Sequence, residues 1–231
     1  MKNKFENIKE DQNLLQSDLI ILTETWLDEE EDFSCYDLPG FKANFNNGGR
    51  GKGLTTYFNG RYMHKIDIKK EGISVTMVKS EHLDIIGVYR SQGGDMKDLV
   101  KILETLIDRT RTTIVGGDFN VCVFKNPNNL VTHMLKGTGF SQIVKTATHI
   151  NGGVLDHIYI KQNGNKFSWD IEDFPKYYSD HDSLGLTLWS RNENTGKKHY
   201  FLVCYSIHLF QNDYQQLMAD KYHYQRIRRK G

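Results

Sequence analysis

The sequence has few of the features that mark secreted, fibrous or membrane-spanning chains. Its three cysteines, Cys35, Cys122 and Cys204, lie far apart and lack the C-x-x-C spacing of a structural metal site. Only three prolines and no low-complexity run are present, which favours a folded body over a linker-rich chain. The longest mostly apolar stretch, residues 200–210, is too short and too polar to span a bilayer, and no secretion signal is evident. We therefore expect an intracellular protein, nuclear or cytoplasmic, that is not secreted and enters no membrane.

Charge is distributed unevenly along the 231 residues, although the formal net charge is only +1. Residues 191–231 carry eight Lys or Arg against three Asp or Glu, whereas residues 1–190 carry 22 against 26. An acidic body does not bind nucleic acid by bulk charge, but a divalent metal in an acidic cleft can still hold a phosphate group. We expect one domain over residues 1–189 and a basic, aromatic-rich C-terminal extension over residues 190–231, which ends in the basic cluster 226–230.

Apolar patterns predict alternating hairpins, strands and helices. The run Thr112–Val115 leads into Gly-Gly-Asp-Phe-Asn, which predicts a buried strand that delivers Asp118 and Asn120 to a sheet edge. A continuous apolar stripe predicts a helix over residues 97–109, with Asp95 as its N-cap. Further helices are expected over residues 4–16 and 130–135, and further strands over 18–22, 54–58, 73–78, 83–89, 155–161 and 183–189. Together these elements predict an α/β fold, a layered sandwich with mixed sheets.

Polar residues with catalytic potential stand at the ends of the predicted strands. Strand ends on one rim of a sheet converge on a common cleft. Carboxylates with one amide and one histidine, and without a cysteine ligand, form a hard, oxygen-rich set that suits Mg²⁺ or Mn²⁺. Each residue alone also has a structural explanation, because Gly-Gly-Asp is usually a turn and a strand-end acid usually faces solvent. The residues are Glu24, Tyr89, Asp118, Asn120, Asp156, Asp180 and His181.

Four short motifs, taken together, resemble the endonuclease/exonuclease/phosphatase superfamily. They are Thr-Glu-Thr-Trp-Leu at 23–27, Gly-Asp-Phe-Asn at 117–120, Thr-His-Ile-Asn-Gly-Gly-Val-Leu-Asp-His at 148–157 and Ser-Asp-His at 179–181. In this order, over residues 3–189, they look most like the endonuclease domain of non-LTR retrotransposons. The resemblance implies a DNase I-like fold, a four-layered α/β sandwich with two mixed β-sheets. It also implies a metal-dependent phosphodiesterase that nicks DNA. No obligate protein partner is evident from the sequence.

The resemblance implies a role for each catalytic residue. Asp118 is similar to the aspartate that activates or positions the attacking water, and Asn120 to the asparagine that orients it and contacts phosphate. Asp156 is similar to the aspartate that pairs with the catalytic histidine, here His181. A histidine held by a carboxylate keeps its proton near neutral pH, so its imidazolium can donate to a phosphoryl oxygen. Tyr89 looks like the family tyrosine that reaches the scissile phosphate. We expect Asp118 and His181 to lie on the rim of a cleft.

The resemblance also implies metal ligands and a first strand. Glu24 is similar to the family's metal-binding glutamate, and Asp180 lies where a second metal-side carboxylate is found, for Mg²⁺ or Mn²⁺. The family begins with a strand that carries an asparagine at the metal site, whereas this chain starts at Met1, inside the turn that follows. We therefore expect an N-terminally truncated member that lacks the first strand beside residues 18–22, unless the run 200–210 supplies a replacement strand.

Other functions remain open at this stage. A nuclease that repairs abasic sites, or a phosphatase that acts on phospholipids or inositol phosphates, would use the same residues on the same fold. A truncated remnant without catalytic activity is a further alternative. His157 follows Asp156 directly, and strand alternation points it to the opposite face, so we expect a structural role for it.

Overall fold

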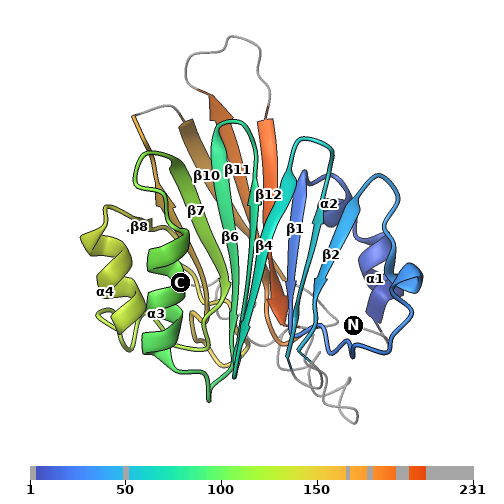
Figure 1. The fold of residues 1–231 in the computed structure, drawn as a ribbon, viewed down its shortest axis with the longest axis horizontal. Coiled ribbons are helices and arrows are strands. Elements are labelled where there is room, and N and C mark those ends of the chain that lie inside the picture. The colour runs from blue at the N-terminus through green and yellow to red at the C-terminus, as the bar shows by residue number, and fades with distance from the viewer. Residues whose placement is uncertain (1–3, 49–51, 165–166, 176–178, 191–197, 207–231) are drawn as a thin grey trace, which may run out of the picture.

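The computed structural model describes residues 4–48, 52–164, 167–175, 179–190 and 198–206, which form two facing sheets with helices outside them (Figure 1). The helices are α1 (Phe5–Glu10), α2 (Gln12–Leu15), α3 (Met96–Leu106) and α4 (Leu130–Gly137), with a 3₁₀ turn, η2, at Phe33–Tyr36. None of the helices in these described ranges is long and apolar enough to cross a membrane. In spatial order the first sheet holds β10 (Phe167–Phe174), β11 (Ser183–Ser190), β12 (Lys198–Ser206), β1 (Leu19–Thr23), β3 (Leu54–Phe58) and β2 (Lys42–Asn46). The second holds β4 (Met63–Lys70), β5 (Ile73–Lys79), β6 (Leu83–Arg90), β7 (Thr112–Asp118), β9 (Asp156–Lys161) and β8 (Ser141–Gln142).

Three clusters of buried apolar side chains separate four layers. In β1, Leu19 and Ile21 belong to the cluster between the two sheets, whereas Ile20 and Leu22 belong to the cluster under α1 and α2. Strands of the second sheet alternate in the same way, between the inter-sheet cluster and a third cluster under α3 and α4. Because β1 pairs in parallel with β12 and β6 with β7, both sheets are mixed. The predicted four-layered α/β sandwich with two mixed sheets is confirmed.

The elements that the sequence failed to predict are the edges of both sheets. Every interior strand except β12 was expected directly, whereas β2, β4, β8 and β10 were not, and these four strands are the edges. Most residues of β4 are exposed or half-exposed, since only one neighbour covers an edge strand. Two helix boundaries also differ from the prediction. The helix expected over residues 4–16 is divided at Asp11 into α1 and α2, and α3, capped by Asp95 as predicted, ends at Leu106.

Strand β12 fills the position beside β1 that the family's first strand was expected to leave unpaired. It runs parallel to β1, with Leu19 opposite Phe201, and antiparallel to β11, with Leu184 opposite Val203. Part of the C-terminal extension is therefore a central strand of the first sheet, the alternative considered for residues 200–210. The boundary between a domain at 1–189 and an extension at 190–231 stays a prediction. Residues 207–231, with the basic cluster 226–230, lie outside the described residues.

The imidazole of His157 is neutral and fully hydrogen-bonded in the interior. Its Nε2 lies 2.9 Å from the carbonyl oxygen of Val121, which only accepts, so Nε2 carries the proton. The Tyr159 hydroxyl, 3.0 Å from Nδ1, therefore donates to this nitrogen, and it accepts from Thr132 Oγ1 at 2.7 Å. The ring also stacks on Phe119, with 4.7 Å between ring centroids. Burial lowers the pKa of His157 to about 4.

A proline in β12 tests whether this strand holds the first sheet together. Val203 lies opposite Ile21 of β1 and Leu184 of β11, so Val203→Pro removes a donor from the centre of the sheet. A carbonyl left unpaired costs about 1–3 kcal/mol, and we expect the thermal midpoint to fall by about 5 °C or more. The matched control, Lys65→Pro, lies at the register shift of edge strand β4 and should lower the midpoint much less. Equal midpoints for the two variants would contradict a central role for β12.

Acid should destabilise the protein partly through His157. Its pKa is lower in the folded state than in the unfolded state, so the unfolded state binds more protons between pH 6.5 and about 4. The free energy of unfolding should therefore decrease as the pH falls through this window, by up to about 3 kcal/mol from this residue alone. In His157→Gln this contribution should disappear, whereas the exposed control His133→Gln should keep the parent's pH dependence. Urea unfolding at several pH values measures it, and identical profiles for parent and His157→Gln would refute this role.

Candidate active site

Three of the predicted site residues lie side by side across the second sheet. Tyr89 at the end of β6 is opposite Asp118 of β7, and Asp118 is opposite Asp156 at the start of β9. Directly opposite residues share one face of a sheet, and Tyr89 belongs to the cluster between the sheets. The Tyr89 hydroxyl donates to Glu24 Oε1 at 3.0 Å, and Glu24 follows β1 of the other sheet. The site therefore forms where the ends of strands from both sheets meet.

His181 and Asp156 form the closest pair in the site. His181 Nδ1 lies 2.7 Å from Asp156 Oδ2, and both side chains are buried. Burial alone would lower the pKa of His181, but the charge and hydrogen bond of Asp156, with the charges of Asp118 and Asp180, raise it to about 10. The imidazole is therefore cationic at neutral pH, with its Nδ1 proton donated to Asp156.

Asp118 lies beside this pair and is held by Asn120. The Asn120 backbone N–H donates to Asp118 Oδ1 at 2.8 Å, and its side-chain amide donates to Oδ2 at 3.1 Å. Burial raises the pKa of Asp118 well above its ordinary value, and the carboxylates of Asp156 and Glu24 raise it further, whereas the charge of His181 acts in the opposite direction. The expected rim position is wrong: Asp118 is 0% exposed and His181 5%. Asp118 is buried because β7 lies between β6 and β9 and is buried throughout, and His181 is buried because it packs against Asp156 and His149.

Sequence reasoning missed Arg90, which fixes the turn after β7. This buried guanidinium donates to the carbonyl oxygens of Phe119 at 2.7 Å, Asn120 at 2.9 Å and Gly94 at 2.8 Å. In return, the Asn120 side-chain amide donates to the carbonyl oxygen of Arg90 at 3.0 Å. The only available signal was that Arg90 directly follows Tyr89. A single buried arginine rarely stands out in a sequence.

Unusual backbone conformations surround the site. Glu24, Trp26 and Asn120 have φ values of 50°, 56° and 48°, in the left-handed region that costs non-glycine residues about 1–3 kcal/mol. Gly117 has φ of 140°, and a Cβ there would lie 1.9 Å from the carbonyl oxygen of Val88. Only glycine therefore permits the close approach of β7 to β6 just before Asp118. Such strain accumulates where a fold must aim particular side chains.

The acidic residues offer oxygen atoms that fit a divalent metal. Within the described part of the chain, Asp118, Asp156 and His181 form one group of potential ligand atoms that all lie within 4.8 Å of one another. Asp156 Oδ1 and Asp180 Oδ1 are buried acceptors without a hydrogen-bond partner among the described residues, an arrangement that a cation would satisfy. Glu24 belongs to neither ligand group, so its predicted role as a metal ligand beside Asp180 stays a prediction.

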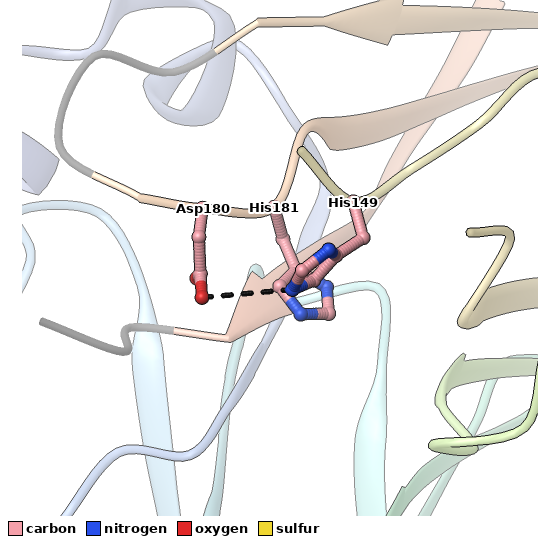
Figure 2. A group of neighbouring side chains, drawn as sticks. All are labelled: His149, Asp180 and His181. Carbon is pink, nitrogen blue, oxygen red and sulfur yellow. Dashed lines mark ion pairs between the residues drawn. The ribbon is translucent and has the colours of Figure 1, made fainter. Parts of the chain in front are cut away.

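A second group combines Asp180 and His181 with His149, which was not predicted as a site residue. His149 Nε2 lies 3.7 Å from Asp180 Oδ2, and the ring centroids of His149 and His181 are 4.7 Å apart. Figure 2 shows the three side chains together. His149 stands in the motif Thr148–His157, four residues before Gly153. Its position in a loop motif was the available signal, but no periodicity could show that the loop returns to His181.

Solved structures with this fold include several enzymes. An AP endonuclease from Archaeoglobus fulgidus matches with a TM-score of 0.58 and 16% identity, over 81% of this chain and 92% of that one. A 3′ phosphatase, NExo, from Neisseria, bound to a product DNA hairpin, matches with a TM-score of 0.57 and 13% identity, over 82% and 93%. The endonuclease domain of TRAS1, a telomere-specific non-LTR retrotransposon, matches with a TM-score of 0.51 and 12% identity, over 76% and 99%. At these identities the likeness shows the fold.

The sequence itself gives the family. No curated protein sequence matches this chain. The profile of the Endonuclease/Exonuclease/phosphatase family, however, matches residues 6–181, which contain every predicted site residue from Glu24 to His181. The chain therefore belongs to the Endonuclease/Exonuclease/phosphatase family.

Proposed function

We propose that the protein is a Mg²⁺-dependent phosphodiesterase that nicks DNA, an endonuclease of retrotransposon origin. The proposal depends above all on the 2.7 Å hydrogen bond between His181 Nδ1 and Asp156 Oδ2 beside the buried Asp118. This arrangement combines a cationic donor with a carboxylate that can take up a proton, the two functions that phosphodiester hydrolysis requires. Similarity to the TRAS1 endonuclease domain and to a DNA-bound 3′ phosphatase supports DNA as the substrate.

Asp118 is the residue we assign to the attacking water. Its pKa is raised by burial and by neighbouring carboxylates, and a carboxylate with a raised pKa accepts a proton from water more readily than an exposed one. Asn120 holds both oxygens of Asp118, and Arg90 holds the backbone of Asn120. The base is thus fixed in place before a substrate binds, which lowers the cost of reaching the transition state.

His181 is the residue we assign to the phosphoryl oxygens. Its Nδ1 is bound to Asp156, and its cationic ring keeps a second N–H, on Nε2, to donate to a developing negative charge. The Tyr89 hydroxyl lies beside the site and donates its one proton to Glu24, and this hydrogen bond links the two sheets. The pKa of Tyr89 is raised, mainly by burial, so its hydroxyl keeps its proton.

A divalent metal fits the same residues. Asp156 and Asp180 each offer a buried hard oxygen donor without a hydrogen-bond partner among the described residues, and we assign Glu24 to the metal as well, as the resemblance implies. When bound, Mg²⁺ would neutralise charge on the phosphoryl group.

We assign the DNA backbone to a hollow of about 400 Å³ whose lining includes Tyr89 of the site. Its three lysines can contact phosphate oxygens locally, whereas its three acids cancel the net charge of the lining, so bulk electrostatic attraction contributes little. The charged residues that line it are Lys52, Lys69, Lys70, Asp28, Glu29 and Glu71.

Two substitutions test the proposed chemistry. Asp118→Asn removes the proton acceptor, and His181→Ala removes the cationic donor, so each should lower the rate of Mg²⁺-dependent plasmid nicking about a hundredfold or more. Asp118→Asn removes a buried charge without changing the side-chain size, but its NH2 group cannot accept one of the two hydrogen bonds from Asn120, so we expect a loss of about 1–3 kcal/mol in the free energy of unfolding. His181→Ala leaves Asp156 without its partner and should lower the free energy of unfolding by about 1–3 kcal/mol.

Matched controls and other substrates complete this test. Asp170→Asn and His133→Ala change the same residue types at exposed positions and should nick at the parent's rate. The parent is also assayed on an abasic oligonucleotide and on phosphorylated lipids, which separates DNA nicking from the repair and phosphatase alternatives. Nicking at the parent's rate by Asp118→Asn or His181→Ala would refute the assigned roles. A parent that hydrolyses none of these substrates would refute the proposed function.

A further inference from the structure

His149 and His181 face each other across a short antiparallel bridge. Two backbone hydrogen bonds, at 2.9 and 2.7 Å, flank this pair: Ile150 N to Asp180 O and Asp182 N to Thr148 O. Because these bonds join the residues before and after the pair, His149 and His181 form a non-hydrogen-bonded pair, in which side chains come closest. The backbone therefore places both imidazoles on one side of the bridge.

The two rings contact each other edge to face. Their centroids are 4.7 Å apart, and the ring planes are inclined by 86° (Figure 2). Aromatic rings prefer this edge-to-face arrangement to a face-to-face stack. His181 is thus held on two sides, by Asp156 at its Nδ1 and by the ring of His149.

The ring of His149 is itself fixed. The backbone N–H of Asn151 donates to His149 Nδ1 at 3.0 Å, so the neutral ring carries its proton on Nε2. That nitrogen lies 3.7 Å from Asp180 Oδ2. His149 therefore connects the backbone of its own loop to Asp180 on one side and to His181 on the other.

We infer that His149 is a positioning residue of the hydrolytic site, which acts through its ring contact with His181. Asp156 holds one nitrogen of His181 but leaves the imidazole able to tilt about this hydrogen bond. The ring of His149 prevents the tilt and so keeps the opposite nitrogen, Nε2, directed at one point. A displacement of about 1 Å at a reacting group lowers a rate about a hundredfold. The inference rests on the proposed function, since its effect is read as hydrolysis.

Three variants of the full chain separate the ring contact from other effects. His149→Ala removes the ring, and it should lower kcat of Mg²⁺-dependent plasmid nicking about tenfold or more, with little change in KM. His149→Phe keeps an aromatic ring against His181 and should restore most of the lost rate. His149→Gln keeps an N–H near Asp180 but no ring, and it should remain as slow as His149→Ala. The exposed control His133→Ala should match the parent.

A double-mutant cycle with His181 gives the decisive comparison. If His149 acts through His181, then His149→Ala added to His181→Ala lowers the residual rate no further. An additional loss of tenfold in this background would overturn the inference, as would full activity of His149→Ala alone. Thermal midpoints detect a purely structural defect. Such a defect would lower the midpoint of His149→Ala, and the nicking rates of His149→Phe and His149→Gln would then be equal. An inactive parent would refute the proposed function instead, so the two failures remain distinct.

Discussion

Charge balance inside the sandwich is the constraint on which this site depends. Asp118 and Asp156 lie opposite each other on adjacent strands, and each is at most 1% exposed. Two neighbouring carboxylates that are buried away from water cannot both remain charged without a compensating cation. His181 supplies that cation through its hydrogen bond to Asp156. The proposed chemistry uses the same arrangement, because the group that balances the buried acids is also the donor assigned to the phosphoryl oxygens.

The two-sheet architecture delivers these groups to one place. The second sheet contributes Tyr89, Asp118 and Asp156 from three adjacent strands, and the first contributes Glu24 from the end of β1. Strand β12 runs between β1 and β11, and β11 directly follows the segment that carries His181. The first sheet is therefore continuous from Glu24 to the histidine, and the C-terminal part of the chain supports the site through the sheet.

The sequence predicts the interior of this fold far better than its periphery. Interior strands are buried on both faces, so runs such as residues 18–22 and 83–89 are mostly apolar and stand out in the sequence. The edge strands β4 and β10 are richer in polar residues, and the short alternation of Phe167, Trp169 and Ile171 in β10 was not recognised as a strand. Asp156 and His181 are 25 positions apart in the sequence. Only the family resemblance predicted that they form a pair. Arg90 donates to backbone carbonyl oxygens, and His149 is brought to His181 by a loop bridge. Neither contact leaves a pattern of residue types in the sequence.

The protonation state of His181 tests the central claim most directly. Nitrogen NMR of the metal-free protein at pH 8 distinguishes a ring with two protonated nitrogens from a neutral ring with one. With a pKa of about 10, His181 should have both nitrogens protonated at this pH, and its Nδ1 proton should be shifted by the hydrogen bond to Asp156. A neutral His181 ring at pH 8 would mean that the buried acids are not balanced by this histidine, and it would contradict the proposed role of the pair.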